Sequence, residues 1–186
     1  MTTAAPESAA FAVWITGLPA SGKSVVSAAL VEQLKSRGVE TVVLESDALR
    51  KEFSTHPSYD SSDRDYFYGS TAFIGKVLTD HGLPVIFDAT ANRRAYRDRA
   101  RTQIQKFLEI YVDSPLEVCM KRDPKGIYRK ALAGESDNVP GVQAEYEAPE
   151  NPEVVIHGDR ESPDVAAARI ITVLEDRGWV PREKVD

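Results

Sequence analysis

Eight residues near the N-terminus have the types and the spacing of a phosphate-binding loop. The run Gly17-Leu18-Pro19-Ala20-Ser21-Gly22-Lys23-Ser24 matches G-x-x-x-x-G-K-[ST] at every fixed position. Its glycines allow backbone conformations that other residues rarely adopt, so successive N–H groups can point at phosphate oxygens. The lysine can reach the β- and γ-phosphates of a nucleotide, and the serine hydroxyl can bind Mg²⁺. We therefore predict that residues 17–24 bind ATP, with Lys23 in a catalytic role and Ser24 as a metal ligand.

Carboxylates follow two apolar runs that resemble buried strands. Asp47 comes soon after Thr41–Leu44, with Arg50 about one helical turn further on, and Asp88 comes directly after Val85–Phe87. Ligands of an open parallel sheet bind beyond the carboxyl ends of its strands, so these groups should face the phosphate loop. We expect Asp47 to orient or deprotonate an acceptor hydroxyl, and Asp88 to hold Mg²⁺ directly or through water. The alternative for each carboxylate is a local cap of a helix or turn.

Arginines can supply the positive charge that stabilises phosphoryl transfer. Arg64, Arg94 and Arg122 are suitable cations, and we expect Arg94 to be catalytic and Arg122 to bind the nucleotide. Five arginines also crowd into residues 93–101: Arg93, Arg94, Arg97, Arg99 and Arg101. Such a cluster is either a solvated helix face or a surface that handles phosphate, and the sequence favours neither.

Apolar periodicity places these groups on alternating strands and helices. Strands are predicted at Phe11–Thr16, Thr41–Leu44, Val85–Phe87, Phe107–Val112 and Val154–Ile156. Helices are predicted at Ser24–Lys35, Arg64–Asp80, Ala95–Gln105, Leu116–Lys121 and Asp164–Arg177. This alternation indicates right-handed crossovers. We expect an α/β fold of the P-loop NTPase type, with a five-stranded parallel sheet and helices on both faces.

One segment breaks the alternation of strands and helices. Residues 122–152 hold many charges, three glycines and four prolines, without a clear apolar period or an evident core of their own. We expect a mobile lid before the last strand, because Tyr128 and Tyr146 are hard to explain in the alternative, a disordered loop. We expect the lid to belong to a single domain at about residues 11–180 of the 186, preceded by a disordered tail at residues 1–10.

Composition excludes several classes of function. A formal net charge of −6 argues against binding a long nucleic acid. The single cysteine, Cys119, excludes an intrachain disulfide and fits a reducing compartment, where we expect it to be a packing residue. No apolar run reaches the roughly 18–20 residues that cross a bilayer, and no signal peptide is evident. We expect a cytoplasmic protein that acts on a small molecule and binds no membrane.

Longer runs resemble the adenylylsulfate kinase family. The resemblance covers roughly residues 11–176, and its most specific parts are Ile110–Cys119, Arg122–Ala131 and Tyr146–Glu153. It implies transfer of the γ-phosphoryl group of ATP, with Mg²⁺, to the 3′-hydroxyl of adenosine 5′-phosphosulfate in sulfate assimilation. Members of the family often form dimers, so the resemblance allows for a homodimer, although no periodicity in this chain marks an interface.

The resemblance also implies residues that bind the acceptor. Asp47 and Arg50 match the second aspartate and the arginine of the family's D-G-D-N-x-R, and Arg64 matches an arginine that contacts the nucleotide substrate. Tyr59 falls where the family has one of two phenylalanines that sandwich the adenine. Lys125 belongs to the lid signature D-P-K-G.

Departures from the family pattern gather at the acceptor. The family's D-G-D-N reads Glu45-Ser46-Asp47-Ala48. Phe67 and Gly69 stand where an N-x-R-R run has asparagine and arginine, Ala91 begins the counterpart of S-P-Y-R, and Val139 replaces the second stacking phenylalanine. We count Phe67, Ala91 and Val139 with the acceptor-binding positions. Losing one face of an aromatic sandwich forfeits stacking worth roughly 1–3 kcal/mol.

Three functions therefore stay open on the sequence alone. The first is an adenylylsulfate kinase with an atypical acceptor pocket. The second is a related kinase for another nucleotide-linked or small acceptor, since Asp88-Ala89-Thr90 resembles the D-A-T of polynucleotide-kinase-like and zeta-toxin-like kinases. The third is a non-catalytic nucleotide-binding module, which the intact loop and strand-end carboxylates disfavour.

Overall fold

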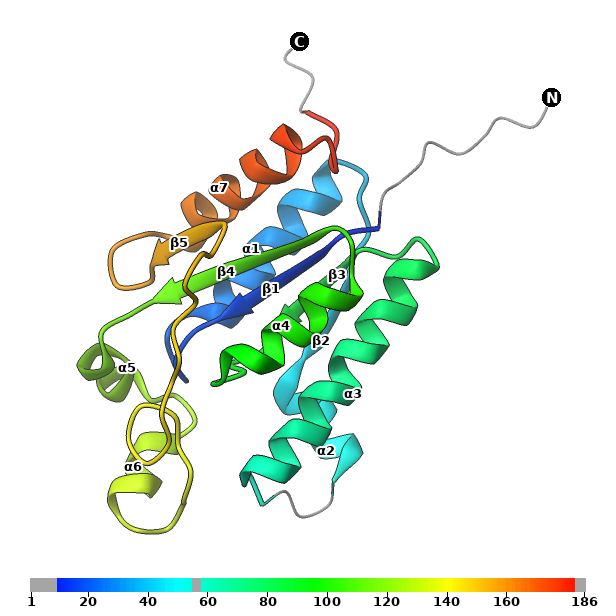
Figure 1. Cartoon of the computed structure of the whole chain (residues 1–186). Coiled ribbons are helices and arrows are strands. Elements are labelled where there is room, and N and C mark those ends of the chain that lie inside the picture. Colours follow the sequence, from blue (N-terminus) through cyan, green and yellow to red (C-terminus); the bar gives the residue numbers. More distant parts are fainter. Residues whose placement is uncertain (1–9, 55–57, 183–186) are drawn as a thin grey trace, which may run out of the picture.

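The computed structural model describes residues 10–54 and 58–182. Its elements follow in the order β1 (Ala12–Thr16), α1 (Lys23–Ser36), β2 (Val42–Glu45), α2 (Ser46–Phe53), α3 (Ser61–Asp80), β3 (Val85–Asp88), α4 (Arg94–Gln103), β4 (Phe107–Asp113), α5 (Leu116–Arg122), α6 (Ile127–Leu132), β5 (Val154–His157) and α7 (Pro163–Asp176) (Figure 1). The tail predicted for residues 1–10 falls outside the described residues except for Ala10. None of the helices in these two ranges combines the length and the apolar character that crossing a membrane requires.

The strands form one parallel sheet in the order β2-β3-β1-β4-β5. The central strand β1 pairs with β3 on one side and β4 on the other, which sets Ile15 beside Asp88 and Thr16 beside Tyr111. The chain therefore leaves β1 where the strand order reverses, and such a point is where open α/β sheets bind ligands. The predicted five-stranded parallel sheet is confirmed.

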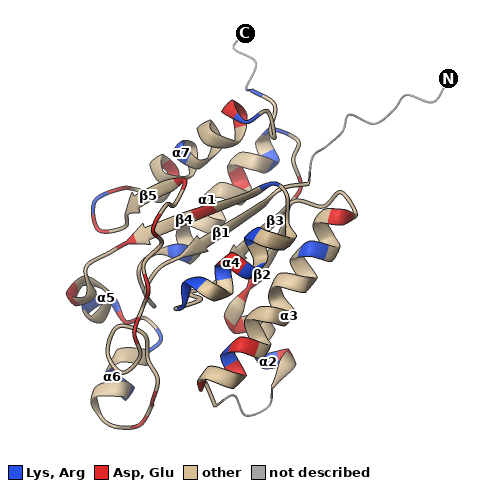
Figure 2. Ribbon diagram, viewed as in Figure 1, with Lys and Arg blue, Asp and Glu red and all other residues tan. Residues whose placement is uncertain are grey.

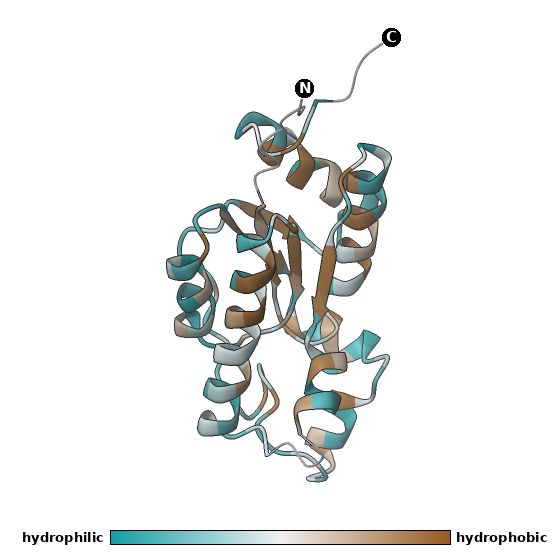
Figure 3. Ribbon diagram, turned by 90° about the vertical axis from the view of Figure 1, so that its right-hand side faces the viewer, coloured by the Kyte–Doolittle hydropathy of each residue, from teal (hydrophilic) through white to brown (hydrophobic). Residues whose placement is uncertain are grey.

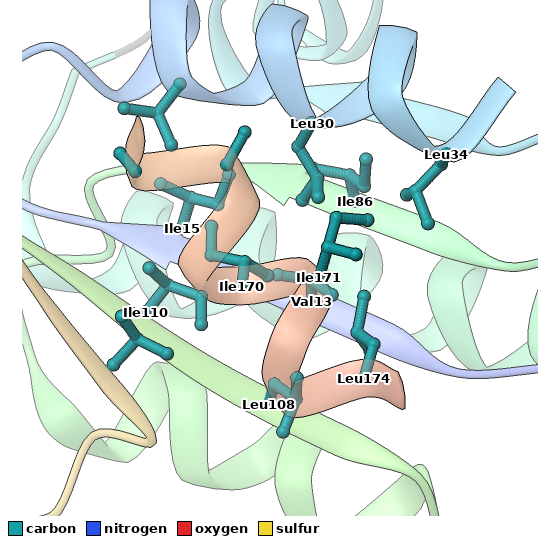
Figure 4. Packing of buried hydrophobic residues seen from close by; sticks show 14 of the residues in the cluster. Val13, Ile15, Leu30, Leu34, Ile86, Leu108, Ile110, Ile170, Ile171 and Leu174 are labelled. Carbon is teal, nitrogen blue, oxygen red and sulfur yellow. The ribbon is translucent and has the colours of Figure 1, made fainter. Parts of the chain in front are cut away.

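Two hydrophobic layers hold the central strand in place. Val13 and Ile15 pack against Leu30 of α1 and the apolar face of α7 (Figure 4). On the other face, under α3 and α4, the indole of Trp14 stacks on Phe87 with ring centroids 4.4 Å apart. Figure 3 shows the apolar strands enclosed between helices whose outer faces are hydrophilic. The loop that follows β1 thus starts from a rigid, doubly covered strand.

Helix α2 extends the sequence prediction at the end of β2. It follows β2 without a loop, because the Glu45 carboxylate accepts a hydrogen bond from the Ala48 N–H at 3.2 Å and caps the helix. Helix α3 also begins earlier than predicted, at Ser61, since the Asp60 carboxylate accepts the backbone N–H groups of the first turn. The last residue of β3 is Asp88, which belongs to the strand rather than to the loop after it.

The segment predicted as a coreless lid has a small core. Cys119 and Tyr128 are buried together with Val139, and Leu18 and Ala20 of the phosphate loop pack against them. Helix α6, absent from the sequence prediction, carries Tyr128 into this cluster. The expectation that residues 122–152 lack a core is therefore wrong, and the position of Cys119 as a buried packing residue is confirmed. The segment does precede the last strand, as predicted.

Residues 145–153, which we call the strap, run back along the sheet toward β5. The Glu147 N–H donates to the Asn92 carbonyl at 2.8 Å, and the Asn92 amide donates to the Glu145 carbonyl at 2.8 Å. The Tyr146 hydroxyl lies 3.0 Å from the Thr16 hydroxyl. These contacts, at the carboxyl ends of β1 and β3, attach the C-terminal part of the predicted lid to the sheet.

Candidate active site

A cavity of about 670 Å³ opens at the carboxyl ends of the strands. It is bounded by the phosphate loop, by the starts of α2 and α3, and by the segment around α6. Most residues predicted for the site line it: Pro19, Ala20, Gly22, Lys23, Ser24, Asp47, Arg50, Tyr59, Arg64, Asp88, Arg122, Lys125 and Val139. The fold therefore brings the predicted nucleotide loop, metal ligands and acceptor residues to one site.

Six predicted residues are not among those that line the cavity: Gly17, Leu18, Ser21, Phe67, Ala91 and Arg94. Gly17, Leu18 and Ser21 belong to the phosphate loop itself. Phe67 and Ala91 are buried in the layer under α3 and α4, where the Ala91 N–H donates to the Tyr68 hydroxyl at 3.0 Å. Arg94 lies at the start of α4, and its guanidinium is 3.3 Å from Glu150 in the strap.

The phosphate loop has the backbone that its motif predicts. A Cβ on Gly17 would lie 2.5 Å from the Val112 carbonyl oxygen, so only glycine fits there. Gly22, with φ of 112°, turns the chain into α1. The Lys23 ammonium donates to the carbonyls of Gly17 at 3.2 Å and Leu18 at 2.9 Å, which closes the loop on itself. Burial lowers the pKa of Lys23, and the carboxylate of Asp88 partly offsets that shift.

Three side chains from later in the chain hold the loop by its carbonyl groups. The Tyr128 hydroxyl donates to the Pro19 carbonyl at 2.9 Å. The Ser114 hydroxyl and the Arg122 guanidinium donate to the Ser21 carbonyl at 2.8 and 3.3 Å. Because these bonds occupy loop carbonyls, side chains from later in the chain hold the loop in place from outside. Sequence reasoning missed Tyr128 and Ser114, since neither lies near the motif in the chain.

The donors for a magnesium ion are oxygens of the kind that this ion prefers. Ser24 at the start of α1 and Asp88 at the end of β3 line the same cavity, and Asp88 is largely buried. Among the described residues, no group of three histidine, cysteine, aspartate or glutamate side chains forms a complete metal cage. A site with one hydroxyl and one carboxylate suits Mg²⁺ that takes its other ligands from water and phosphate. The residues therefore fit the predicted ion.

Asp47 lies in the first turn of α2 and faces a lysine of the α6 segment. Its carboxylate accepts a hydrogen bond from the Lys125 ammonium, which also lies 3.8 Å from Glu45. That hydrogen bond raises the pKa of Lys125. Since Glu45 caps α2, the alternative reading of Asp47 as the helix cap is wrong. The carboxylate of Asp47 is half exposed and available to a ligand that displaces Lys125.

Arg64 joins three segments at the acceptor side of the cavity. Its guanidinium donates to the Tyr59 carbonyl at 2.8 Å, to the Asn92 amide oxygen at 2.5 Å and to the Asn138 carbonyl at 2.5 Å. Burial lowers the pKa of Arg64, and the nearby Arg50 lowers it further. Asn92 and Asn138 were not predicted for the site. The position of Asn92 shortly after β3 is a signal that could have found it, whereas nothing in the local sequence marks Asn138.

The arginine cluster at residues 93–101 forms ion pairs with acidic residues. Figure 2 shows basic residues gathered along α4. Arg97 is buried against Glu109 at 2.5 Å, Arg101 pairs with Glu153 at 2.9 Å, and Arg99 pairs with Asp65. The cluster therefore connects α4 to β4, to the strap and to α3. Arg97 fits neither a solvated face nor phosphate handling.

The fold and the site together define a P-loop phosphotransferase: a loop with lysine and serine follows the central strand, and carboxylates at the end of β3 and in the first turn of α2 line the same cavity. The chain belongs to the adenylylsulphate kinase family, whose model matches residues 9–157. The family predicted from its motifs is therefore confirmed.

The names of relatives with similar sequences agree with that membership. The adenylyl-sulfate kinase of Halothermothrix orenii is 36% identical over 168 residues, which are 90% of this chain and 91% of the relative. The adenylyl-sulfate kinase of Synechococcus sp. (strain JA-3-3Ab) is 38% identical over 168 residues, which are 90% of this chain and 96% of the relative. A probable bifunctional SAT/APS kinase 2 of Sorangium cellulosum is 38% identical, and the chain spans 30% of its length.

A solved structure of an APS kinase has the same fold as this chain. The Mycobacterium tuberculosis APS kinase CysC, in complex with AMPPNP and APS, superposes with a TM-score of 0.84 at 32% identity. The match covers 89% of this chain and 98% of the other. The predicted P-loop kinase fold is thereby confirmed.

Proposed function

We propose that this protein transfers the γ-phosphoryl group of ATP to the 3′-hydroxyl of adenosine 5′-phosphosulfate. The observation that carries the proposal is that one cavity unites the phosphate loop with Asp47 and with an acceptor wall of Arg50, Tyr59 and Arg64. Membership of the adenylylsulphate kinase family supports it, and so does the likeness to a kinase solved with AMPPNP and APS.

The chain's own groups can bind and orient the reactants. N–H groups of the loop and the start of α1 would hold the phosphates of ATP, and Lys23 would exchange its bonds to the Gly17 and Leu18 carbonyls for phosphate oxygens. Ser24 and Asp88 would hold Mg²⁺. When bound, this ion neutralises charge that develops on the phosphates. Such catalysis consists mainly of positioning and charge stabilisation.

Asp47 would receive the proton of the acceptor hydroxyl. In the free protein the Lys125 ammonium occupies the Asp47 carboxylate, so Lys125 has to move away before the acceptor hydroxyl can reach it. The anionic groups of an incoming substrate offer Lys125 a competing partner. We therefore assign Lys125 to the substrate phosphates in the loaded site and to Asp47 in the free protein.

A related acceptor is the second candidate. Val139 is buried in the small core with Cys119 and Tyr128, so at that position the cavity offers an aliphatic surface in place of an aromatic face. Tyr59 alone would then stack on a base, which weakens base discrimination. A screen of nucleotide-linked compounds for ADP release tests this candidate, and a response restricted to adenylylsulfate contradicts it.

The decisive experiment combines purified protein, Mg²⁺, ATP and adenosine 5′-phosphosulfate, with ADP and the 3′-phosphorylated product as readouts. Both products should appear in equal amounts. Asp47→Asn should lower kcat by about 10²–10⁴-fold, the usual range for a general base. Lys23→Ala should abolish turnover under any kinase hypothesis, and full activity of that variant would mean that the loop is misassigned. No ADP above background at millimolar substrate would reject the proposal.

We also propose a homodimer through the outer face of α3. Tyr66, Phe73 and Val77 are exposed on this face, and Tyr66, Gly69 and Phe73 border a hollow that Arg99 also lines. Projecting rings and a hollow on one helix allow two copies to fit each other in antiparallel fashion. Light scattering should give a dimer that Phe73→Glu converts to a monomer, and a monomeric parent protein would refute this.

The expected cytoplasmic location stays a prediction.

A further inference from the structure

Phe67 lies on α3, behind the acceptor side of the cavity. It is 2% exposed and is not among the cavity-lining residues. Its ring supports the guanidinium of Arg50, whose central carbon lies 3.9 Å from the ring centroid. Phe53 and Tyr68 contact the same ring edge-on, with centroids 5.9 and 5.1 Å away. The ring is therefore a fixed surface on which Arg50 rests.

A second ring and a carboxylate also contact Arg50. The Tyr59 ring centroid lies 4.7 Å from the guanidinium carbon, and the Asp63 carboxylate accepts a hydrogen bond from Nη1 of the guanidinium at 2.7 Å. Asp63 accepts the Tyr59 N–H as well, at 3.1 Å. Arg50 is only 6% exposed, yet it lines the cavity. Aromatic rings and one carboxylate thus contact the guanidinium and restrict its movement.

This arrangement changes how Arg50 can bind an anion. A free arginine side chain loses rotamer freedom when its planar fork binds a phosphate or sulfate group. A guanidinium that is already stacked has lost that freedom before the ligand arrives, so less binding free energy is spent on ordering it. The aromatic face also attracts the cation directly.

We propose that Phe67 is a positioning residue for the acceptor, because it holds Arg50 in the plane from which the guanidinium meets an anionic group of that substrate. The inference rests on the proposed function, since it takes Arg50 to bind the acceptor. Phe67 itself touches no substrate. Its contribution is the orientation of Arg50, and it should act on acceptor binding without acting on ATP.

The first test is Phe67→Leu, which keeps apolar bulk and removes the ring face. At saturating Mg–ATP, the KM for adenosine 5′-phosphosulfate should rise about five-fold, equivalent to about 1 kcal/mol. The KM for ATP should stay the same, and kcat should change by less than about two-fold, because the reacting groups are untouched. In an Arg50→Met background, Phe67→Leu should have no further effect on the acceptor KM.

Phe107→Leu is the matched control. Phe107 is buried on β4, and Arg101 lies over its ring at 5.0 Å, so the same substitution removes the same kind of contact outside the site. This variant should lose stability to unfolding but keep the parent acceptor KM. An equal rise in KM for both variants would mean that Phe67 acts only through general stability, and would overturn the inference.

A second measurement does not depend on turnover. In the free protein, the NMR order parameter of the Arg50 side-chain Nε–H should fall in Phe67→Leu and stay unchanged in Phe107→Leu. Three results would each refute the positioning role of Phe67. They are an unchanged order parameter of Arg50 in Phe67→Leu, an unchanged acceptor KM in Phe67→Leu, and a rise in the acceptor KM when Phe67→Leu is added to Arg50→Met. If the parent protein releases no ADP with adenosine 5′-phosphosulfate, the proposed function fails and the acceptor role of Phe67 fails with it. The Arg50 signal separates that failure from a failure of positioning alone.

Discussion

Replacing Glu109 by glutamine removes the charge that faces the buried Arg97 guanidinium. The Arg97 side chain is 0% exposed and Glu109 is 8% exposed, with 2.5 Å between Nε and Oε1. Arg97 also donates to the carbonyls of Ala91 and Glu147, so this one side chain ties α4 to the strap. The substitution keeps the shape of residue 109 and leaves a positive charge in the interior.

The expected cost follows from that geometry. Removing one partner of a buried ion pair costs about 3–5 kcal/mol, because the other charge loses its compensation. Arg97 keeps two carbonyl acceptors, and glutamine keeps an amide oxygen, so we expect the lower end, about 3 kcal/mol. In a domain of this size each kcal/mol lowers Tm by about 2–4 °C, which predicts a fall of about 6–12 °C.

Urea unfolding followed by circular dichroism measures the loss, with the m-value as a check that the unfolding transition is unchanged. Glu150→Gln is the control, because Glu150 forms an exposed pair with Arg94 and should contribute less than about 1 kcal/mol. The cycle is completed by Arg97→Met, in whose background Glu109→Gln should cost much less. A loss equal to that of Glu150→Gln, or one of the same size in both backgrounds, would refute the reasoning.

Four further predictions address other contacts. Gly75→Ala would place a Cβ 2.1 Å from the Phe87 ring and should cost about 1–3 kcal/mol in urea unfolding, since the ring is stacked on Trp14; an unchanged stability contradicts this packing. Burial opposes ionisation of Glu153, but Arg101 and the Glu109 N–H outweigh it and hold the Glu153 pKa below its usual value of 4.5. The parent protein should therefore be more stable than Glu153→Gln, with the full difference in stability above pH 4.5 and none once the pH has fallen through the lower pKa of the folded state. A difference in Tm that does not change with pH would contradict the pairing. Tyr128→Phe removes the bond to the Pro19 carbonyl and should weaken ATP binding in calorimetry by about five-fold, or about 1 kcal/mol, without changing the acceptor KM. Chelation of Mg²⁺ should abolish turnover, and added Mg²⁺ should restore it; activity in excess chelator would exclude a role for Ser24 and Asp88 as ligands.

The phosphate loop and the sheet could be predicted because their signals are local. Gly17 and Gly22 are required by the backbone at their own positions, and the buried strands are short apolar runs. The positions of Asp47 and Asp88 followed from the rule that parallel strands present their carboxyl ends at one edge. The residues that determine these features lie close together in the sequence.

The rest depended on contacts between distant parts of the chain. Helix α6 has six residues and is held by Tyr128 against the loop after β1, more than a hundred positions away in sequence. Arg97 looked like a surface charge because its partner, Glu109, lies on another element. Arg94 was predicted to be catalytic as a cation suited to phosphoryl transfer, and its side chain lies beside Glu147 and Glu150 in the strap. Charge patterns along a sequence do not reveal which charges are neutralised in space.

The small core of the α6 segment has a consequence for attempts to change acceptor preference. Val139 contributes to the same hydrophobic cluster as Leu18 and Ala20, which belong to the loop for the ATP phosphates. A bulkier side chain at position 139 would press on that loop as well as on the acceptor. Variant libraries at this position should thus show epistasis with residues 18 and 20, and gains on a new acceptor should come with altered nucleotide affinity.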